Sequence, residues 1–224
     1  MGKIIQGRSI AEDIKEELKV KLQKIKQNTG RAPIVASIIV GNDGGSVFYV
    51  NNQQKVAMSL GIGFEKIHLE ENIKEEALIK TIDGLNKRNE ITGIILQLPL
   101  PQSLDSKKII STIAPEKDID CLTYINQGKL YMGEDVHLPC TPNSVITLLS
   151  TMDIALEGKE VVVIGRSNIV GKPLANLMLN KNCTVTICHS KTRDLELICK
   201  RADILISAIG KPKFITADLS LIHI

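Results

Sequence analysis

The amino-acid sequence predicts an α/β protein of two lobes, each built on a mainly parallel β-sheet. Its 224 residues are enough for one large domain or two modest ones with a substantial core. Apolar runs of strand length alternate with stretches of helical periodicity, which is typical of parallel sheets with crossover helices. An irregular region with several prolines and glycines, from Ser103 to Pro142, interrupts this alternation. We therefore expect domains at residues 1–142 and 143–218.

The first lobe begins with a helix. Ser9 and Glu12 fit a capping box, in which both side chains bond to free backbone N–H groups of the first turn. Apolar residues then recur near the helical period as far as Ile25, and the helix ends between Asn28 and Pro33. We expect strands at 34–40, 64–69 and 91–97, separated by helices at about 46–60 and 73–87.

The second lobe continues the alternation. Asn143 is placed to cap a helix over 144–152. We expect strands at 161–164, 184–188 and 204–209, and helices at 173–179 and 195–201. The longest apolar runs lie in these strands and are far too short to span a bilayer, so the sequence predicts no membrane association.

The composition narrows the class of protein. The 28 Lys and Arg residues nearly balance the 25 Asp and Glu residues, and no basic block is present, so nucleic acid is not expected as a partner. The N-terminus does not resemble a secretory signal. Five cysteines without a CxxC pair favour a reduced, cytoplasmic protein with buried thiols, and no metal site is predicted.

A loop in the second lobe has the position of a phosphate-binding turn. The segment Gly165-Arg166-Ser167-Asn168-Ile169-Val170-Gly171-Lys172-Pro173 joins a predicted buried strand to a helix, where a dinucleotide pyrophosphate would meet helix-terminal N–H groups. It departs from G-x-G-x-x-G, because Ser167 replaces the second glycine and Val170 the third. The two glycines could also serve only to allow tight turns.

The end of the next strand favours NADP over NAD as the cofactor. An NAD site requires a carboxylate there, which binds the ribose 2′-hydroxyl. The segment from Cys188 to Arg193 contains a serine, a histidine and basic residues, and the first acid is Asp194. Ser190 and the guanidinium of Arg166 suit a 2′-phosphate. His189 is assigned no chemical step.

Four polar residues of the first lobe are candidates for a site. Tyr49 and Gln53 lie four residues apart on a predicted helix and share a face. Gln97 follows a strand, at the end where α/β folds place ligand contacts. Asp120 follows in an irregular segment. Taken singly, each also has an ordinary structural interpretation.

Together these segments resemble the bifunctional methylenetetrahydrofolate dehydrogenase/methenyltetrahydrofolate cyclohydrolase family, called FolD in bacteria. The resemblance covers residues 1 to about 218. It rests on six segments in order: Ser46-Val47-Phe48-Tyr49-Val50, Gln97-Leu98-Pro99-Leu100-Pro101, Lys117-Asp118-Ile119-Asp120, Pro139-Cys140-Thr141-Pro142, Gly165-Arg166-Ser167 through Pro173, and His189-Ser190-Lys191-Thr192.

The resemblance implies a fold, a reaction and a set of site residues. It implies a folate-binding lobe at 1–142 and a Rossmann-like NADP-binding lobe at 143–218, with the folate in a cleft between them. The one-carbon bridge of 5,10-methylenetetrahydrofolate would be oxidised, and water would then open the methenyl product to 10-formyltetrahydrofolate. The implied folate-binding residues are Tyr49, Gln53, Gln97, Leu98, Pro99 and Asp120. The cofactor phosphates would contact Gly165, Arg166, Ser167 and Ser190.

The sequence departs from the family pattern at the residue assigned to the cyclohydrolase step. The pattern is Y-V-x-x-K, and here Gln53 takes the lysine position. An amide has no proton that titrates in the useful range, so it cannot act as general acid or base. Lys55 points about 200° away around the helix and cannot replace it. We therefore expect a retained dehydrogenase and a severely weakened cyclohydrolase. Cys121 and Ser144 also stand where the family usually has glycine.

The C-terminal end is the second departure. Members of the family continue beyond Asp218 with another strand, an active-site loop and a helix. Residues 219–224 match the translation of a sequencing-adaptor end, so we expect a truncated chain with a non-native tail. A homodimer is expected if the C-terminus were complete. Two alternatives stay open: an inactive folate- or NADP-binding fragment, and another two-lobed NADP dehydrogenase of the shikimate type.

Overall fold

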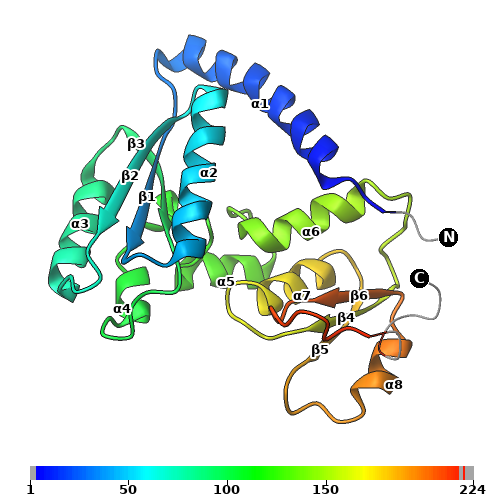
Figure 1. Cartoon of the computed structure of the whole chain (residues 1–224). Coiled ribbons are helices and arrows are strands. Elements are labelled where there is room, and N and C mark those ends of the chain that lie inside the picture. The colour runs from blue at the N-terminus through cyan, green and yellow to red at the C-terminus, as the bar shows by residue number, and fades with distance from the viewer. Residues whose placement is uncertain (1–3, 217–218, 220–224) are drawn as a thin grey trace. The chain divides into compact units, whose positions relative to one another are not determined.

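The computed structural model describes residues 4–216 and residue 219 (Figure 1). These residues form two compact units. One comprises Arg8–Asn126, and the other comprises the described residues from Gln127 onwards together with those before Arg8. The domain boundary between residues 142 and 143 stays a prediction. It rests on the pattern of motifs in the sequence, whereas the two units are defined by how the residues pack. The non-native tail expected at 219–224 lies, apart from Leu219, outside the described residues.

The first unit contains a three-stranded parallel sheet in the order β2-β1-β3. Its strands are β1 (Ile34–Val40), β2 (Gly63–Leu69) and β3 (Ile91–Leu96), which confirms the three predicted strands to within one residue. The apolar residues of β1 alternate between the two faces of the sheet. The sheet therefore requires a helix on each side.

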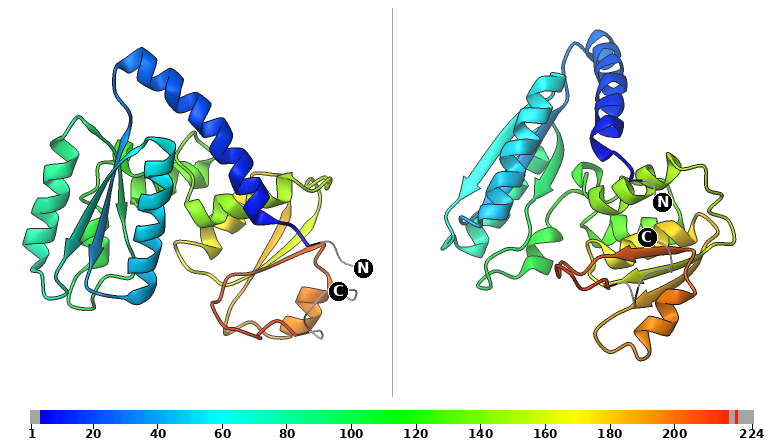
Figure 2. Two further views of the ribbon diagram at one scale, coloured as in Figure 1. Left: turned by 45° about the horizontal axis from the view of Figure 1, so that its top comes forward. Right: turned by 45° about the vertical axis from the view of Figure 1, so that its right-hand side comes forward.

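Two helices cover the two faces of this sheet. Helix α2 (Gly44–Leu60) lies along one face and α3 (Glu75–Lys87) along the other, as Figures 1 and 2 show. On the α3 side, Leu78, Ile82 and Leu85 join the buried side chains of β1 and β3 in one core. Because the three strands are parallel, their carboxyl ends lie at the same edge of the sheet, and the loops that lead to the helices begin there.

Helix α1 (Gly7–Thr29) is confirmed, but the predicted capping box is wrong. The helix begins at Gly7, so Ser9 already lies within its first turn and cannot be the N-cap. In α2 the cap is formed by Asp43, whose carboxylate accepts from the backbone N–H of Ser46 at 2.8 Å. That cap fixes the start of the helix that carries Tyr49.

The region expected to be irregular, 103–142, contains helices, so that expectation is wrong. They are α4 (Ser106–Ile110), the 3₁₀ turn η1 (Pro115–Lys117), α5 (Tyr124–Met132) and the first turn of α6 (Cys140–Ser150). Asp105 caps α4 by accepting from the N–H groups of Lys107 and Lys108. These helices are too short to give a clear apolar period.

The second unit contains another three-stranded parallel sheet, in the order β5-β4-β6. Its strands are β4 (Glu160–Ile164), β5 (Thr184–Cys188) and β6 (Ile204–Ser207). Helix α7 (Gly171–Leu179) packs with α6 on one face, and α8 (Leu195–Lys200) packs on the other. The strand and helix order confirms the predicted α/β class for this lobe.

Two smaller expectations about this unit are tested. The N-cap of α6 is Pro139 rather than Asn143, because the chain is already helical from Cys140. Four of the five thiols are buried as expected, whereas Cys140 is exposed. Across the described ranges, no helix combines the length and the apolar character needed to cross a membrane.

Candidate functional site

Two glutamines from different elements meet on one face of the first sheet. Gln97 directly follows β3, and its backbone N–H donates to the carbonyl of Ile38 on β1 at 2.9 Å. Its side-chain Nε2 lies 3.2 Å from Oε1 of Gln53. Helix α2 carries Gln53 and packs through the buried residues Val50 and Ala57. The structure thus brings together two residues that the sequence singled out.

The same amide nitrogen has a second partner that sequence reasoning missed. Ser37 lies in the middle of β1 and is fully buried, and its Oγ is 3.3 Å from Nε2 of Gln97. It is the single polar residue of the apolar run Ile34–Val40. That interruption of an otherwise apolar strand is the signal that could have revealed it.

The aromatic candidate lies at the surface of α2. Tyr49 precedes Gln53 by one helical turn, and 61% of its surface is exposed. An aromatic ring in this position is available to stack on a flat ligand. Lys55 on the same helix is also exposed. A second lysine near this helix, Lys66 of β2, is hydrogen-bonded: its Nζ donates to Oδ1 of Asn51 at 2.8 Å.

The loop that carries Asp120 is held in place by its neighbours. Lys117 Nζ donates to the carbonyls of Leu85, Asn86 and Arg88 at the end of α3. Asp118 is fully buried, and its carboxylate accepts from three donors. These donors are the N–H groups of Leu122 and Thr123 and the side-chain amide of Asn126, at 2.9, 2.8 and 3.0 Å. Lys117 and Asp118 are therefore structural, and Asp120 lies half-buried in the same loop.

A glycine of β3 fixes how closely this loop approaches the sheet. A Cβ at Gly93 would lie 2.6 Å from the Ile119 side chain, so a larger residue would push the loop away. The motif residues Leu98 and Pro99, joined by a cis peptide bond, follow Gln97 on the same edge. Leu98 is half-buried and Pro99 is exposed.

The backbone at position 121 has a conformation that glycine adopts most readily. Cys121 has a φ of 55°, in the left-handed region that glycine adopts at least cost. Burial, together with the charges of Asp118 and Asp120, raises the pKa of its thiol to about 12. Ser144 lies inside α6, where its hydroxyl donates to the carbonyl of Cys140. The thiol of Cys121 therefore stays neutral near physiological pH.

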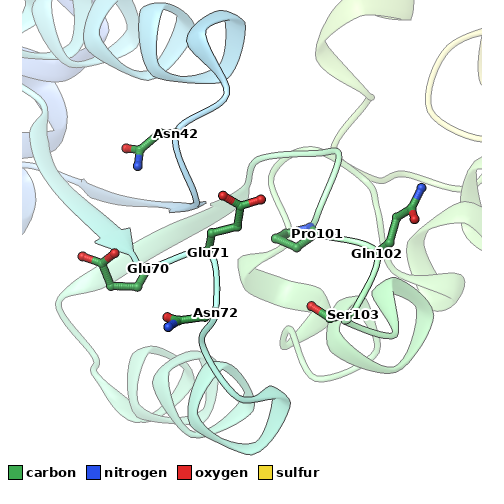
Figure 3. Close-up of a pocket in the computed structure, with 7 residues that line it drawn as sticks. All are labelled: Asn42, Glu70, Glu71, Asn72, Pro101, Gln102 and Ser103. Carbon is green, nitrogen blue, oxygen red and sulfur yellow. The ribbon is translucent and has the colours of Figure 1, made fainter.

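An open cavity of about 750 Å³ lies at the carboxyl ends of the first sheet (Figure 3). Figure 3 shows its lining side chains on the loops that follow β1, β2 and β3. They are Asn42, Glu70, Glu71, Asn72, Pro101, Gln102 and Ser103. None of the predicted site residues is among them. The two carboxylates make this cavity a poor place for an anionic group.

In the second unit, two glycines shape the loop between β4 and α7. A Cβ at Gly165, whose φ is 128°, would lie 2.4 Å from the carbonyl oxygen of Ala208. A Cβ at Gly171 would lie 2.2 Å from the carbonyl oxygen of Gly165. Both glycines are thus required by a close approach of backbone segments. The exposed segment 166–169 forms the outer part of this loop.

Ser167 already binds the first donors of α7. Its Oγ accepts from the N–H groups of Val170 and Gly171 at 3.1 and 3.3 Å, and its carbonyl accepts from Lys172 at 3.0 Å. Pro173 has no N–H group. The N–H groups of Val170, Gly171 and Lys172 are therefore hydrogen-bonded within the loop, and the phosphate contact at this helix end stays a prediction.

The turn after β5 lies beside this loop. Gly165 N–H donates to the carbonyl of Cys188 at 2.8 Å, because β4 and β5 are paired neighbours. Thr192 holds the turn by accepting from the N–H of His189 at 2.8 Å. His189 Nδ1 accepts from the N–H of Lys191, which is a structural role. Ser190 remains exposed at the same sheet edge as Arg166.

Family models match most of the chain. Residues 5–120 match the tetrahydrofolate dehydrogenase/cyclohydrolase catalytic domain. Residues 139–221 match the NAD(P)-binding domain of the same family. The two matches follow the order of the two sheets along the chain.

Individual proteins of this family are similar to the chain in sequence and in structure. A "Bifunctional protein FolD" of Clostridium botulinum (strain Eklund 17B / Type B) is 60% identical over 97% of this chain and 77% of the relative. A FolD dehydrogenase/cyclohydrolase structure from Campylobacter jejuni gives a TM-score of 0.94 at 39% identity, over 97% of this chain and 77% of that one. The Trypanosoma brucei FolD structure, in complex with NADP cofactor and an inhibitor, gives 0.94 at 35% identity, over 98% and 76%.

Proposed function

Because the chain belongs to the tetrahydrofolate dehydrogenase/cyclohydrolase family, we propose that it oxidises 5,10-methylenetetrahydrofolate to 5,10-methenyltetrahydrofolate with NADP. The observation that carries this proposal is the match of both family domains, in order, to one chain. This match favours a folate enzyme over the shikimate-type dehydrogenase considered from the sequence.

The first unit would bind and orient the folate. We assign stacking to the exposed ring of Tyr49, and hydrogen bonding to Gln97 and Asp120. A carboxylate can accept two N–H bonds from an aminopyrimidine ring, which suits a pterin. Leu98 and Pro99 would line the same site. This assignment is supported by the packing of the 117–120 loop against β3, the strand that leads into Gln97.

The second unit fits a dinucleotide. The close approach of Gly165 and Gly171 leaves a loop without side chains at its base, as a phosphate site requires. When bound, NADP supplies the hydride acceptor. Gly165, Arg166, Ser167 and Ser190 would hold its phosphates, and the absence of an acid before Asp194 suits a 2′-phosphate. These residues position the cofactor, while alignment of the two reacting carbons supplies most of the acceleration.

The second family activity, hydrolysis of the methenyl product, would be severely weakened. The amide of Gln53 is hydrogen-bonded to a second amide, Gln97, and neither group carries a titratable proton. The loss of a positioned proton-transfer group costs about 10²–10⁴ in rate. Oxidation does not need that group, so the two activities should separate.

One pair of assays tests the proposal. Purified protein is mixed with methylenetetrahydrofolate and either NADP or NAD, and nicotinamide reduction is followed by absorbance. We expect turnover with NADP and far slower turnover with NAD. Folate-induced thermal stabilisation without turnover would instead indicate a folate-binding protein that is not an enzyme.

Two further expectations are part of the proposal. By analogy with the family, we propose a homodimer for a chain with a complete C-terminus, and a cytoplasmic location. The five cysteines are free thiols, which is typical of proteins in a reducing compartment. Sedimentation of a chain with a restored C-terminus tests the first expectation, and a mass equal to one chain at micromolar concentration would contradict it. Cell fractionation tests the second.

A further inference from the structure

Ser37 faces the helix that carries the folate-side residues. Its strand neighbours Ala36 and Ile38 belong to the core on the α3 side of the sheet. Because side chains alternate along a strand, Ser37 points to the opposite face, which α2 covers. Its Cα partners across the sheet are Lys66 on β2 and Ile95 on β3. A serine at this depth is unusual on energetic grounds.

Burying a hydroxyl without a hydrogen bond costs free energy, so its partner matters. The partner of Ser37 is Nε2 of Gln97, 3.3 Å away, and the same nitrogen lies 3.2 Å from Oε1 of Gln53. An amide nitrogen carries two N–H groups. Ser37 and Gln53 together therefore engage the nitrogen end of the Gln97 amide.

This arrangement leaves two amide ends for a ligand. They are Oε1 of Gln97, an acceptor, and Nε2 of Gln53, a donor. Among the described residues, no fully buried side-chain nitrogen or oxygen lacks a partner. The two free amide ends therefore reach the protein surface.

We propose that Ser37 is a positioning residue of the folate site, which acts through Gln97. Its hydroxyl holds the amide nitrogen inward and so turns Oε1 of Gln97 toward an N–H group of the pterin. The orientation of the Gln97 amide is therefore set jointly by Ser37 on β1 and Gln53 on α2, at the end of β3. This inference rests on the proposed function, since it assigns a role in binding that same substrate.

A matched pair of variants isolates the hydroxyl. Ser37→Thr and Ser37→Val add nearly the same volume to the strand, and only threonine keeps the hydroxyl. A neutral hydrogen bond contributes about 1 kcal/mol, so we expect Ser37→Val to lower kcat/KM for the folate by roughly fivefold relative to Ser37→Thr. The KM for NADP should be the same in both variants. Ser37→Ala, which adds no volume, should show the same loss if the larger residues disturb folding.

A double-mutant cycle separates positioning from simple packing. In a Gln97→Met background no amide remains to be positioned, so the Thr and Val variants should have equal folate kinetics. An unchanged Thr–Val difference in that background would show that Ser37 acts on structure alone and would overturn the inference. Equal kinetics for Thr and Val with Gln97 present would also overturn it. An unmodified chain that neither binds nor oxidises the folate would instead refute the proposed function, and the inference with it.

Discussion

The two regions proposed to bind ligands are organised by different means. On the folate side, side chains from three elements meet: Ser37, Gln53 and Gln97 share hydrogen bonds across β1, α2 and β3. On the nucleotide side, the backbone sets the shape, since Gly165 and Gly171 allow contacts that no Cβ could enter. We therefore expect substitutions in the first region to change which groups can hydrogen-bond to a ligand. Substitutions at the glycines of the second region should change the shape of the loop itself.

The largest effect is expected at a nucleotide-side glycine. Gly171→Ala places a Cβ 2.2 Å from the Gly165 carbonyl oxygen, so the loop must move. We expect loss of NADP reduction, and a loss of about 1–3 kcal/mol in the free energy of unfolding. Chemical denaturation and the reduction assay measure the two effects.

Gly84→Ala is the matched control, because it also lies in a helix but has no atom within 4 Å of the added Cβ. It should stabilise the protein by about 0.5–1 kcal/mol, since alanine is the better helix former. Equal effects of the two substitutions would show that backbone contact does not shape the nucleotide loop.

The next effect separates two acids of one loop. Asp118→Asn replaces one acceptor oxygen of the carboxylate with an NH2 donor that faces other N–H donors, and it should cost about 1–3 kcal/mol in unfolding free energy. Asp120→Asn should chiefly raise the KM for the folate. Melting curves and folate kinetics on both variants distinguish these results. A stability loss confined to Asp120→Asn would reverse the assignment.

A smaller effect is expected at the cofactor phosphate. Arg166→Ala removes a charged donor from the exposed loop and should raise the KM for NADP by about tenfold. The KM for NAD should change little, because NAD lacks the 2′-phosphate. Parallel titrations with the two cofactors measure this change in selectivity. An equal rise for both would place Arg166 away from the 2′-phosphate.

The last effect concerns the ionisation of the buried thiol of Cys121, next to Asp120 in the chain. The folded-state pKa of Cys121 is raised to about 12 from an ordinary value of 9.0. The protonated thiol is therefore favoured by folding, and its stabilising contribution is complete below pH 9 and is lost as pH rises toward 12. Denaturation at pH 8 to 11 should show a shallower decline for Cys121→Ala. An identical slope in both proteins would contradict this.

Much of the fold was predictable because apolar runs determine it. The strand at 34–40 is confirmed with its predicted ends, since a buried parallel strand reads as a nearly continuous apolar run, and the largely β-branched segment at 184–188 is confirmed as well. Helix ends were harder. Ser9 and Asn143 are good capping residues, but the residues before them are already helical, so the helices begin earlier than these residues indicate.

The candidate site was predictable only in part. Gln53 and Gln97 were found from their segments, and the structure brings them into contact. Ser37 was missed, because its contact with Gln97 joins residues 60 positions apart and depends on strand register. The engaged donors of α7 were missed as well, because the sequence does not show that Ser167 folds back onto Val170 and Gly171.

We propose that this chain oxidises the folate, while the amide at position 53 prevents efficient hydrolysis. The most direct test measures hydrolysis of methenyltetrahydrofolate by the unmodified chain and by Gln53→Lys, alongside NADP reduction by each. We predict that lysine raises the hydrolysis rate by about 10²–10⁴ and leaves the oxidation rate within the same order of magnitude. Equal hydrolysis by both proteins, at a rate well above that of the uncatalysed reaction, would contradict the account.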